Sequence, residues 1–291
     1  LDLGPAMRHA RAVLGYQHVV LLGWSGGGSL SAFYQSQAER PTVTSSPCGG
    51  GPDLTQASLP PADALIMMAA HVSRHGTLTE WLDASMIDEC NPTLRDASLD
   101  LYGGEINPPF DDAFLVRYHE AQIARNRKIT SWVKNKLAAL IDAGREHEEF
   151  AFVTHGTMAD PRWLDPRVDP NDRAPGTCYL GDPRIANNGP VGLARFCTLR
   201  SWLSQWSYDD ANACGPTSLG RVTVPVLVVG NSADDACTPQ HTDRLFEAIG
   251  HTRKAMVNIQ GANHYYMGQP ELAAQASAAV LDWLADQGFP V

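Results

Sequence analysis

The sequence contains a serine, two adjacent aspartates and a histidine that together could cleave an acyl bond, each just after a predicted strand. The serine is Ser25, the acid is Asp234 or Asp235, and the histidine is His264. A serine hydroxyl becomes a strong nucleophile when a histidine takes its proton and a carboxylate orients that histidine. These residue types therefore predict hydrolysis through an acyl-enzyme intermediate.

Ser25 lies in a five-residue segment, Gly-Trp-Ser-Gly-Gly, that is typical of a sharp turn between a strand and a helix. Apolar residues 19–22 precede it and predict a buried strand, and a helix-forming segment follows. We expect Gly23 and Gly27 to leave room where the backbone crowds in this turn. The amide of Gly26, at the helix N-terminus, is the expected donor to an oxyanion. A glycine-rich turn with a capping serine would share this pattern, but the flanking strand and helix favour a nucleophile.

Two further apolar segments end close to titratable side chains. Residues 224–230 predict a buried strand that ends just before Asp234 and Asp235, and residues 255–259 predict a strand that precedes His264. Because the carboxyl ends of parallel strands meet at one edge of a sheet, we expect these side chains to gather there. Either aspartate could orient the histidine, and the other would then cap the helix that follows.

In motif and chain order, these segments resemble the α/β-hydrolase superfamily. Segment 23–27 matches the nucleophile elbow of that family, Asn-Ser-Ala-Asp at 231–234 looks like its acid loop, and Gly-Ala-Asn-His at 261–264 looks like its histidine loop. The order serine, aspartate, histidine is also that of the family. The resemblance covers two separate ranges of the chain, residues 17–74 and residues 221–291.

The resemblance implies an α/β-hydrolase fold, in which a mostly parallel sheet carries flanking helices and a helical cap insertion. It also implies a role for each residue. Ser25 is the expected nucleophile and His264 the expected general base. Asp234 is the expected orienting acid, with Asp235 as its rival.

Three consecutive parts of the chain are expected. Residues 1–75 form the first part of the core with the elbow, residues 76–215 form a mainly helical cap or lid, and residues 216–291 form the second part of the core. Within the middle part, apolar residues recur at helical spacing over 110–144 and 191–206. The resemblance implies that such a cap closes the pocket over the nucleophile and selects the substrate.

The predicted reaction is cleavage of a small-molecule carboxylic ester. The residues expected around the substrate are Trp24, His71, Trp202 and Trp206. Alternatives with the same three residues are a C–C hydrolase, an acyltransferase and an aminopeptidase similar to proline iminopeptidases, which would need a carboxylate for the substrate amine. Carboxylates for that purpose occur at Glu80, Asp83, Asp88 and Glu89. A non-enzymatic ligand receptor of the same fold is an alternative of another class.

The part of the sequence before the elbow is short for this fold. Only residues 6–14 predict a helix there, and the loop that carries a His-Gly oxyanion motif in the family is absent. The strand over 17–22 is apolar on both faces and is expected in the middle of a sheet, yet only residues 64–70 offer a neighbouring strand. We therefore expect a missing N-terminal segment or a second chain to complete the sheet and supply a second oxyanion donor.

The composition limits the remaining classes of function. The formal net charge is −10 at pH 7, which argues against nucleic acid and anionic membrane surfaces as partners. No apolar run approaches the length of a membrane span. The six cysteines have no metal-binding spacing, so we expect no metal and no cofactor. The expected location is the cytoplasm.

Overall fold

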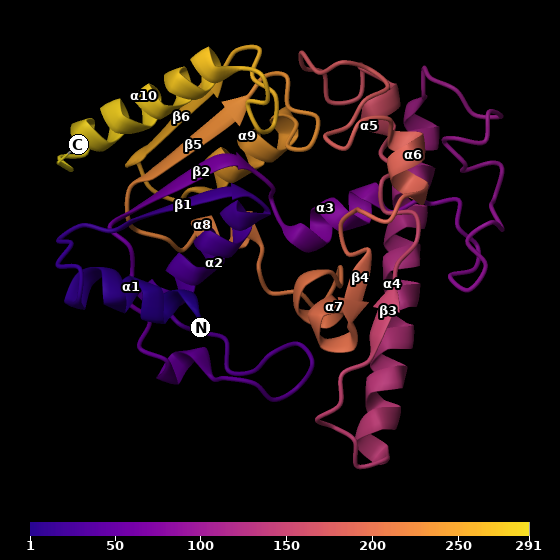
Figure 1. The fold of residues 1–291 in the computed structure, drawn as a ribbon, viewed down its shortest axis with the longest axis horizontal. Helices are drawn as coiled ribbons and strands as arrows, with labels where there is room; N and C mark the ends of the chain where they lie inside the picture. The colour runs from indigo at the N-terminus through magenta and orange to yellow at the C-terminus, as the bar shows by residue number, and fades with distance from the viewer. Residues whose placement is uncertain (291) are drawn as a thin grey trace. The chain divides into compact units, whose positions relative to one another are not determined.

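The computed structural model describes residues 1–290, and the chain divides into two compact units (Figure 1). The core unit comprises Leu1–Arg74, Asp169–Arg173 and the described residues from Ala213 onward. The helical unit comprises His75–Val168 and Ala174–Asn212. A segment of only five residues from the middle of the insertion therefore belongs to the core unit.

Four parallel strands form the sheet of the core unit, in the order β1-β2-β5-β6 (Figure 1). Their bounds are β1 Val20–Ser25, β2 Ala64–Ala70, β5 Val226–Asn231 and β6 Lys254–Ile259. Because all four strands run in the same direction, their carboxyl ends lie along one edge of the sheet. The loops that follow them carry the residues singled out in the sequence.

The two central strands are buried on both faces because alternate side chains pack against helices on opposite sides. Leu65 and Met67 of β2 pack in one cluster with residues of α2, α8 and α9, and Ile66 and Met68 pack in another with residues of α10. Each fully buried side chain of this kind contributes about 1.5–3 kcal/mol. The helices are α2 Gly26–Glu39, α8 Gly215–Leu219, α9 Pro239–Ala248 and α10 Pro270–Asp286.

Strand β1 has one neighbour within residues 1–290, which is β2. Leu22 of β1 is 47% exposed. Within the described residues it is therefore an edge strand, as expected from the single neighbour, residues 64–70, that the sequence offers. An apolar edge with unpaired backbone groups favours pairing with another strand. That a further segment or chain occupies this edge stays a prediction.

The remaining elements of the core unit are α1 Leu3–Ala12 and a short 3₁₀ helix, η1 Leu54–Gln56. Met7 of α1 packs with Tyr34 of α2 and with Ala62, which fixes the helix against the first part of the sheet.

The helical unit is built around α4, Asp112–Asp142, a helix of 31 residues. The helix predicted over 110–144 is confirmed, with Asp111 as its N-cap: the carboxylate accepts a hydrogen bond from the Phe114 amide at 2.7 Å. Within the described residues, no helix is both long and apolar enough to cross a membrane. The shorter helices are α3 Arg74–Trp81, α5 Pro161–Leu164, α6 Pro183–Asn188 and α7 Leu199–Gln205.

The helix predicted over 191–206 is wrong in its first half. Residues Phe196–Thr198 form strand β4, which pairs antiparallel with β3, Ala151–Val153. Helix α7 begins only after Thr198, where Thr198 and Ser201 form a capping box. The helix prediction from apolar spacing holds for α7 alone. The capping box sets the start of the helix at Thr198, even though apolar residues recur at helical spacing before it.

Candidate active site

Ser25 ends β1 and precedes the first residue of α2, in a strained backbone conformation. Its φ is 53° and its ψ is −125°, which is uncommon for a residue with a side chain. The register between β1 and β2 shifts at this point, and the His71 amide donates a hydrogen bond to the Ser25 carbonyl at 3.1 Å. The strain is therefore held by the neighbouring strand, as in a nucleophile elbow.

His264 lies in the loop after β6 and connects the serine with an aspartate. The His264 Nε2 atom is 3.0 Å from the Ser25 Oγ atom, and its Nδ1 atom is 2.8 Å from the Asp234 Oδ2 atom. His264 is 3% exposed and Asp234 is fully buried. A buried carboxylate at this distance favours the tautomer with the proton on Nδ1, in which Nε2 is an acceptor that faces the serine hydroxyl.

Asp234 follows β5 and is fixed by backbone groups of its own loop. Its Oδ1 atom accepts hydrogen bonds from the amides of Ala236 and Cys237, both at 2.7 Å. With one oxygen held by two amides, the other oxygen is directed at the histidine. The architecture follows from three features of one parallel sheet. Ser25 lies in a sharp turn between a strand and a helix, an acid follows β5, and a histidine follows β6.

The fold is that of an α/β-hydrolase.

Comparison with solved structures gives distant likenesses. No family model matches the chain, and no curated protein matches it. A monoacylglycerol lipase from Paleococcus ferrophilus is 15% identical over 98% of this chain and 74% of its own, with a TM-score of 0.43. An alpha/beta fold family hydrolase from Bacillus anthracis is 13% identical over 97% and 73%, with a TM-score of 0.39. The assignment of the α/β-hydrolase fold rests on this chain's own strand order and loops.

Asp235, the rival acid, directly follows Asp234 in the same loop. Burial, and to a smaller extent the nearby charge of Asp234, raise the pKa of Asp235 to about 6. The structure brings Asp234 to within 2.8 Å of the Nδ1 atom of His264. Which aspartate serves catalysis stays a prediction that mutagenesis can test.

The segment Asp169–Arg173 supports the acid loop, although no sequence pattern pointed to it. The Asn171 side-chain amide donates to the Asp234 carbonyl at 2.7 Å, and the Asp172 amide donates to the Ser232 carbonyl at 2.8 Å. In the sequence these residues lie about sixty positions away, in a polar stretch without periodicity. Their role follows from tertiary contacts alone.

Tyr265 also lies near the nucleophile, although no sequence pattern pointed to it. Its side chain hydrogen-bonds with the Ser25 side chain, and burial raises its pKa. The ring stacks on Trp24 with 6.4 Å between centroids, while the Trp24 Nε1 atom donates to the His264 carbonyl at 3.2 Å. Its position directly after the histidine was the one available signal.

The four residues expected around a substrate are placed in two different units. Trp24 and His71 are in the core unit, and the His71 ring centroid lies 6.2 Å from that of His264. Trp202 and Trp206 are buried within the helical unit, where the Trp202 Nε1 atom donates to the Thr130 Oγ1 atom at 2.9 Å. Their common role in a substrate pocket stays a prediction.

The glycines of the elbow differ in what they make room for. A Cβ atom on Gly23 would lie 2.5 Å from the Gly27 carbonyl oxygen, and one on Gly28 would lie 2.4 Å from the Ala70 Cβ atom. A Cβ atom on Gly27 would meet nothing within 4 Å. The expectation for Gly23 is confirmed, but the expectation for Gly27 is wrong: α2 approaches the sheet most closely at Gly28.

We therefore expect Gly23→Ala to destabilise the protein much more than Gly27→Ala. The first substitution forces backbone atoms apart, which costs at least about 1–3 kcal/mol, whereas the second adds a methyl group in open space. Urea unfolding of the two variants, compared with the parent chain, measures the difference. Equal losses of stability would mean that the crowding at Gly23 is relieved by small backbone shifts.

Gly26 is the first residue of α2, where backbone amides lack partners within the helix. The Arg74 side chain lies beside it, since a Cβ atom on Gly26 would be 3.5 Å from the Arg74 Cγ atom. The placement of Gly26 agrees with what an oxyanion donor requires, and the role itself stays a prediction.

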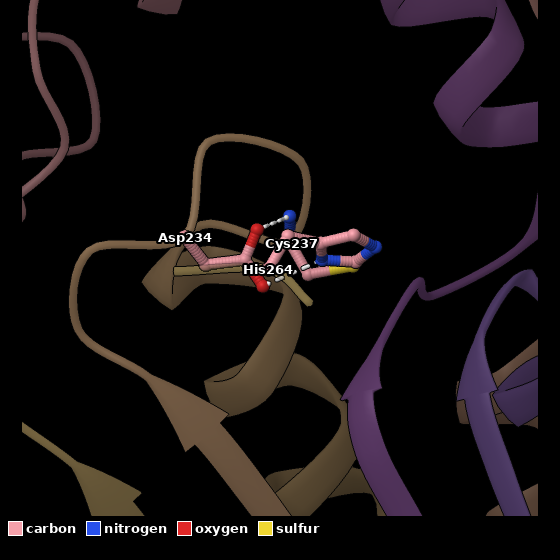
Figure 2. A group of neighbouring side chains, drawn as sticks. All are labelled: Asp234, Cys237 and His264. Carbon is pink, nitrogen blue, oxygen red and sulfur yellow. Dashed lines mark hydrogen bonds and ion pairs between the residues drawn. The ribbon is translucent and has the colours of Figure 1, made fainter. Parts of the chain in front are cut away.

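A possible metal site lies at the same place, although the sequence spacing predicted none. Asp234, Cys237 and His264 each offer one ligand atom, and these atoms lie within 4.8 Å of one another (Figure 2). Two of the residues come from the loop after β5 and the third from the loop after β6. Sequence spacing misses such a group because its members are contributed by different loops.

Proposed function

We propose that this protein is a serine hydrolase that cleaves carboxylic esters. One observation carries the proposal: a continuous hydrogen-bonded chain runs from the Ser25 Oγ atom through both nitrogens of His264 to the Asp234 carboxylate. The strained backbone at Ser25 supports the same conclusion, since strain of this kind is kept where it positions a reacting group.

In the proposed mechanism, the Ser25 Oγ atom attacks the ester carbonyl while His264 takes the hydroxyl proton at Nε2. The tetrahedral intermediate carries a negative oxygen, which the Gly26 amide stabilises. His264 then gives the proton to the departing alcohol, and an acyl-serine remains. Water attacks this acyl group with His264 again as the base, which releases the acid and restores the serine.

An ester suits this site better than the amine-bearing substrate of an aminopeptidase. Three of the four carboxylates considered for binding an amine are already paired with arginines of the helical unit. Glu80 contacts Arg162 at 2.6 Å, Glu89 contacts Arg125 at 2.7 Å, and Asp83 contacts Arg95. A paired carboxylate would lose its partner before it could bind a substrate ammonium.

We further propose that the helical unit acts as a cap that selects the substrate, with Trp24, His71, Trp202 and Trp206 as contact residues. The two points at which the chain passes between the core unit and the helical unit support a cap. The first segment of the core unit ends at Arg74, three residues after His71, and its last segment begins beside the same point, because Ser73 and Cys214 form an antiparallel bridge. The insertion is thus attached at the edge of the sheet where Ser25 lies.

Covalent labelling tests the proposed nucleophile. A fluorophosphonate should add one adduct to the protein, located on the peptide that contains Ser25, because only an activated serine reacts readily with this reagent. Mass spectrometry locates the adduct, and hydrolysis of p-nitrophenyl acetate measures the activity that is lost.

Two variants control the labelling experiment. Ser25→Ala should take no label, and Ser277→Ala, on the exposed surface of α10, should be labelled like the parent. An active protein that carries its label on a different serine would refute the assignment. Faster cleavage of amino-acid anilides than of esters would favour the aminopeptidase alternative.

A further inference from the structure

The side chain of Cys237 lies close to the proposed catalytic histidine, with its Sγ atom within 4.8 Å of a His264 ring nitrogen. It is 2% exposed, and it shares a loop with Asp234, whose Oδ1 atom accepts a hydrogen bond from the Cys237 amide at 2.7 Å. Figure 2 shows the thiol beside the His264 ring and the carboxylate. The proposed mechanism has no use for this thiol, so its position calls for another explanation.

The three side chains present the donor atoms that Zn²⁺ prefers. A carboxylate oxygen, a thiolate sulfur and an imidazole nitrogen are common ligands of this ion in proteins. The ligand atoms of Asp234, Cys237 and His264 lie within 4.8 Å of one another, and all three residues are buried. A tetrahedral zinc ion holds nitrogen and oxygen ligands about 3.3 Å apart. The Nδ1–Oδ2 distance of 2.8 Å would therefore need to open only slightly.

His71 contacts the thiol of Cys237. Its Nδ1 atom is 3.3 Å from the Cys237 Sγ atom, and the residue is 4% exposed. A thiol must lose its proton before it binds a metal ion, and an imidazole at this distance can accept that proton.

We propose that Asp234, Cys237 and His264 form a site for Zn²⁺ at which the ion reversibly inhibits the enzyme. The inhibitory effect rests on the proposed function, whereas binding of the ion does not. Zinc takes the place of the Nδ1 proton of His264, that proton moves to Nε2, and the Cys237 thiol releases one proton. A histidine that carries its proton on Nε2 cannot accept the proton of Ser25.

Metal binding to the full chain tests the site independently of activity. Titration with Co²⁺, which takes similar ligands, should produce the near-ultraviolet absorption of a thiolate–cobalt bond in the parent protein. Cys237→Ser should abolish this absorption, and Cys90→Ser, at an exposed cysteine, should retain it. Circular dichroism of both variants shows whether they fold. An absorption band that survives in a folded Cys237→Ser variant would overturn the site.

Inhibition is then measured as the ratio of ester hydrolysis with and without Zn²⁺, so that the basal activity of a variant does not matter. Micromolar Zn²⁺ should lower the activity of the parent and of Cys90→Ser by at least about tenfold, and EDTA should restore it. Cys237→Ser should need at least about tenfold more Zn²⁺ for the same effect. Mg²⁺, which prefers oxygen ligands, should have no effect.

The two readouts separate the possible failures. A protein that shows the thiolate–cobalt band but hydrolyses no ester would contradict the proposed function and keep the metal site. A protein that hydrolyses esters but shows neither the band nor inhibition would contradict the metal site and keep the proposed function.

Discussion

Replacement of His264 by alanine should lower kcat for ester hydrolysis by about 10⁴–10⁶-fold, with little change in KM. The His264 Nε2 atom, 3.0 Å from the Ser25 Oγ atom, is in place to accept the serine proton, and alanine offers no substitute. Without a base the hydroxyl remains a weak nucleophile in every step that the mechanism requires. Steady-state kinetics with a p-nitrophenyl ester gives both constants.

A matched control for this variant is His9→Ala, at an exposed position of α1 in the same unit. It should keep the kinetic constants of the parent. A loss of less than about tenfold in His264→Ala would contradict the assignment of the base, and a similar loss in both variants would indicate unfolding.

The second large effect should distinguish two neighbouring residues. Asp234→Asn should lower kcat by about 10⁴-fold, because an amide no longer holds the proton of His264 on Nδ1. Asp235→Asn should leave kcat within about threefold of the parent, because the carboxylate oxygen that lies 2.8 Å from that nitrogen belongs to Asp234. Kinetics at saturating substrate measures both. The reverse ranking would assign the orienting role to Asp235.

Asp235→Asn should also change stability, in a way that depends on pH. The pKa of Asp235 is about 6 in the folded protein, above its ordinary value of 3.8, because burial and Asp234 disfavour the charged form. At pH values above 6, the ionised carboxylate therefore lowers the free energy of unfolding by at most about 2–3 kcal/mol. Below about pH 4 the group is protonated in both states and the penalty is absent. The variant should gain stability over the parent as the pH rises from 4 to 7, which urea unfolding would measure.

The elements that the sequence predicts best are those whose side chains are constrained on every side. Strand β2 has the predicted bounds, Ala64–Ala70, because every residue in it is buried and apolar. Helix α4 differs from its prediction by two residues at each end, since a long buried stripe and a capping aspartate agree on its position. The elbow was recognisable because close backbone packing requires a glycine at position 23, which the sequence displays.

The parts that could not be predicted depend on contacts between distant residues. Asp234 and Asp235 are adjacent and chemically identical, so only the folded loop decides which of them reaches His264. The crowding at Gly28 comes from Ala70 on another strand, which no local pattern reveals. Cys237 approaches His264 because two loops meet, and neither loop alone has the spacing of a metal site.

The contact between Asn171 and the carbonyl of Asp234 also limits how this architecture can be rearranged. Residues 75–212 look like a module that recombination could exchange for another, yet five residues from their interior belong to the body of the enzyme and brace its acid loop. A graft that replaced the whole insertion would remove this brace along with the helices. We expect a successful exchange to carry an equivalent of Asp169–Arg173 or to change only the helical segments on either side of it.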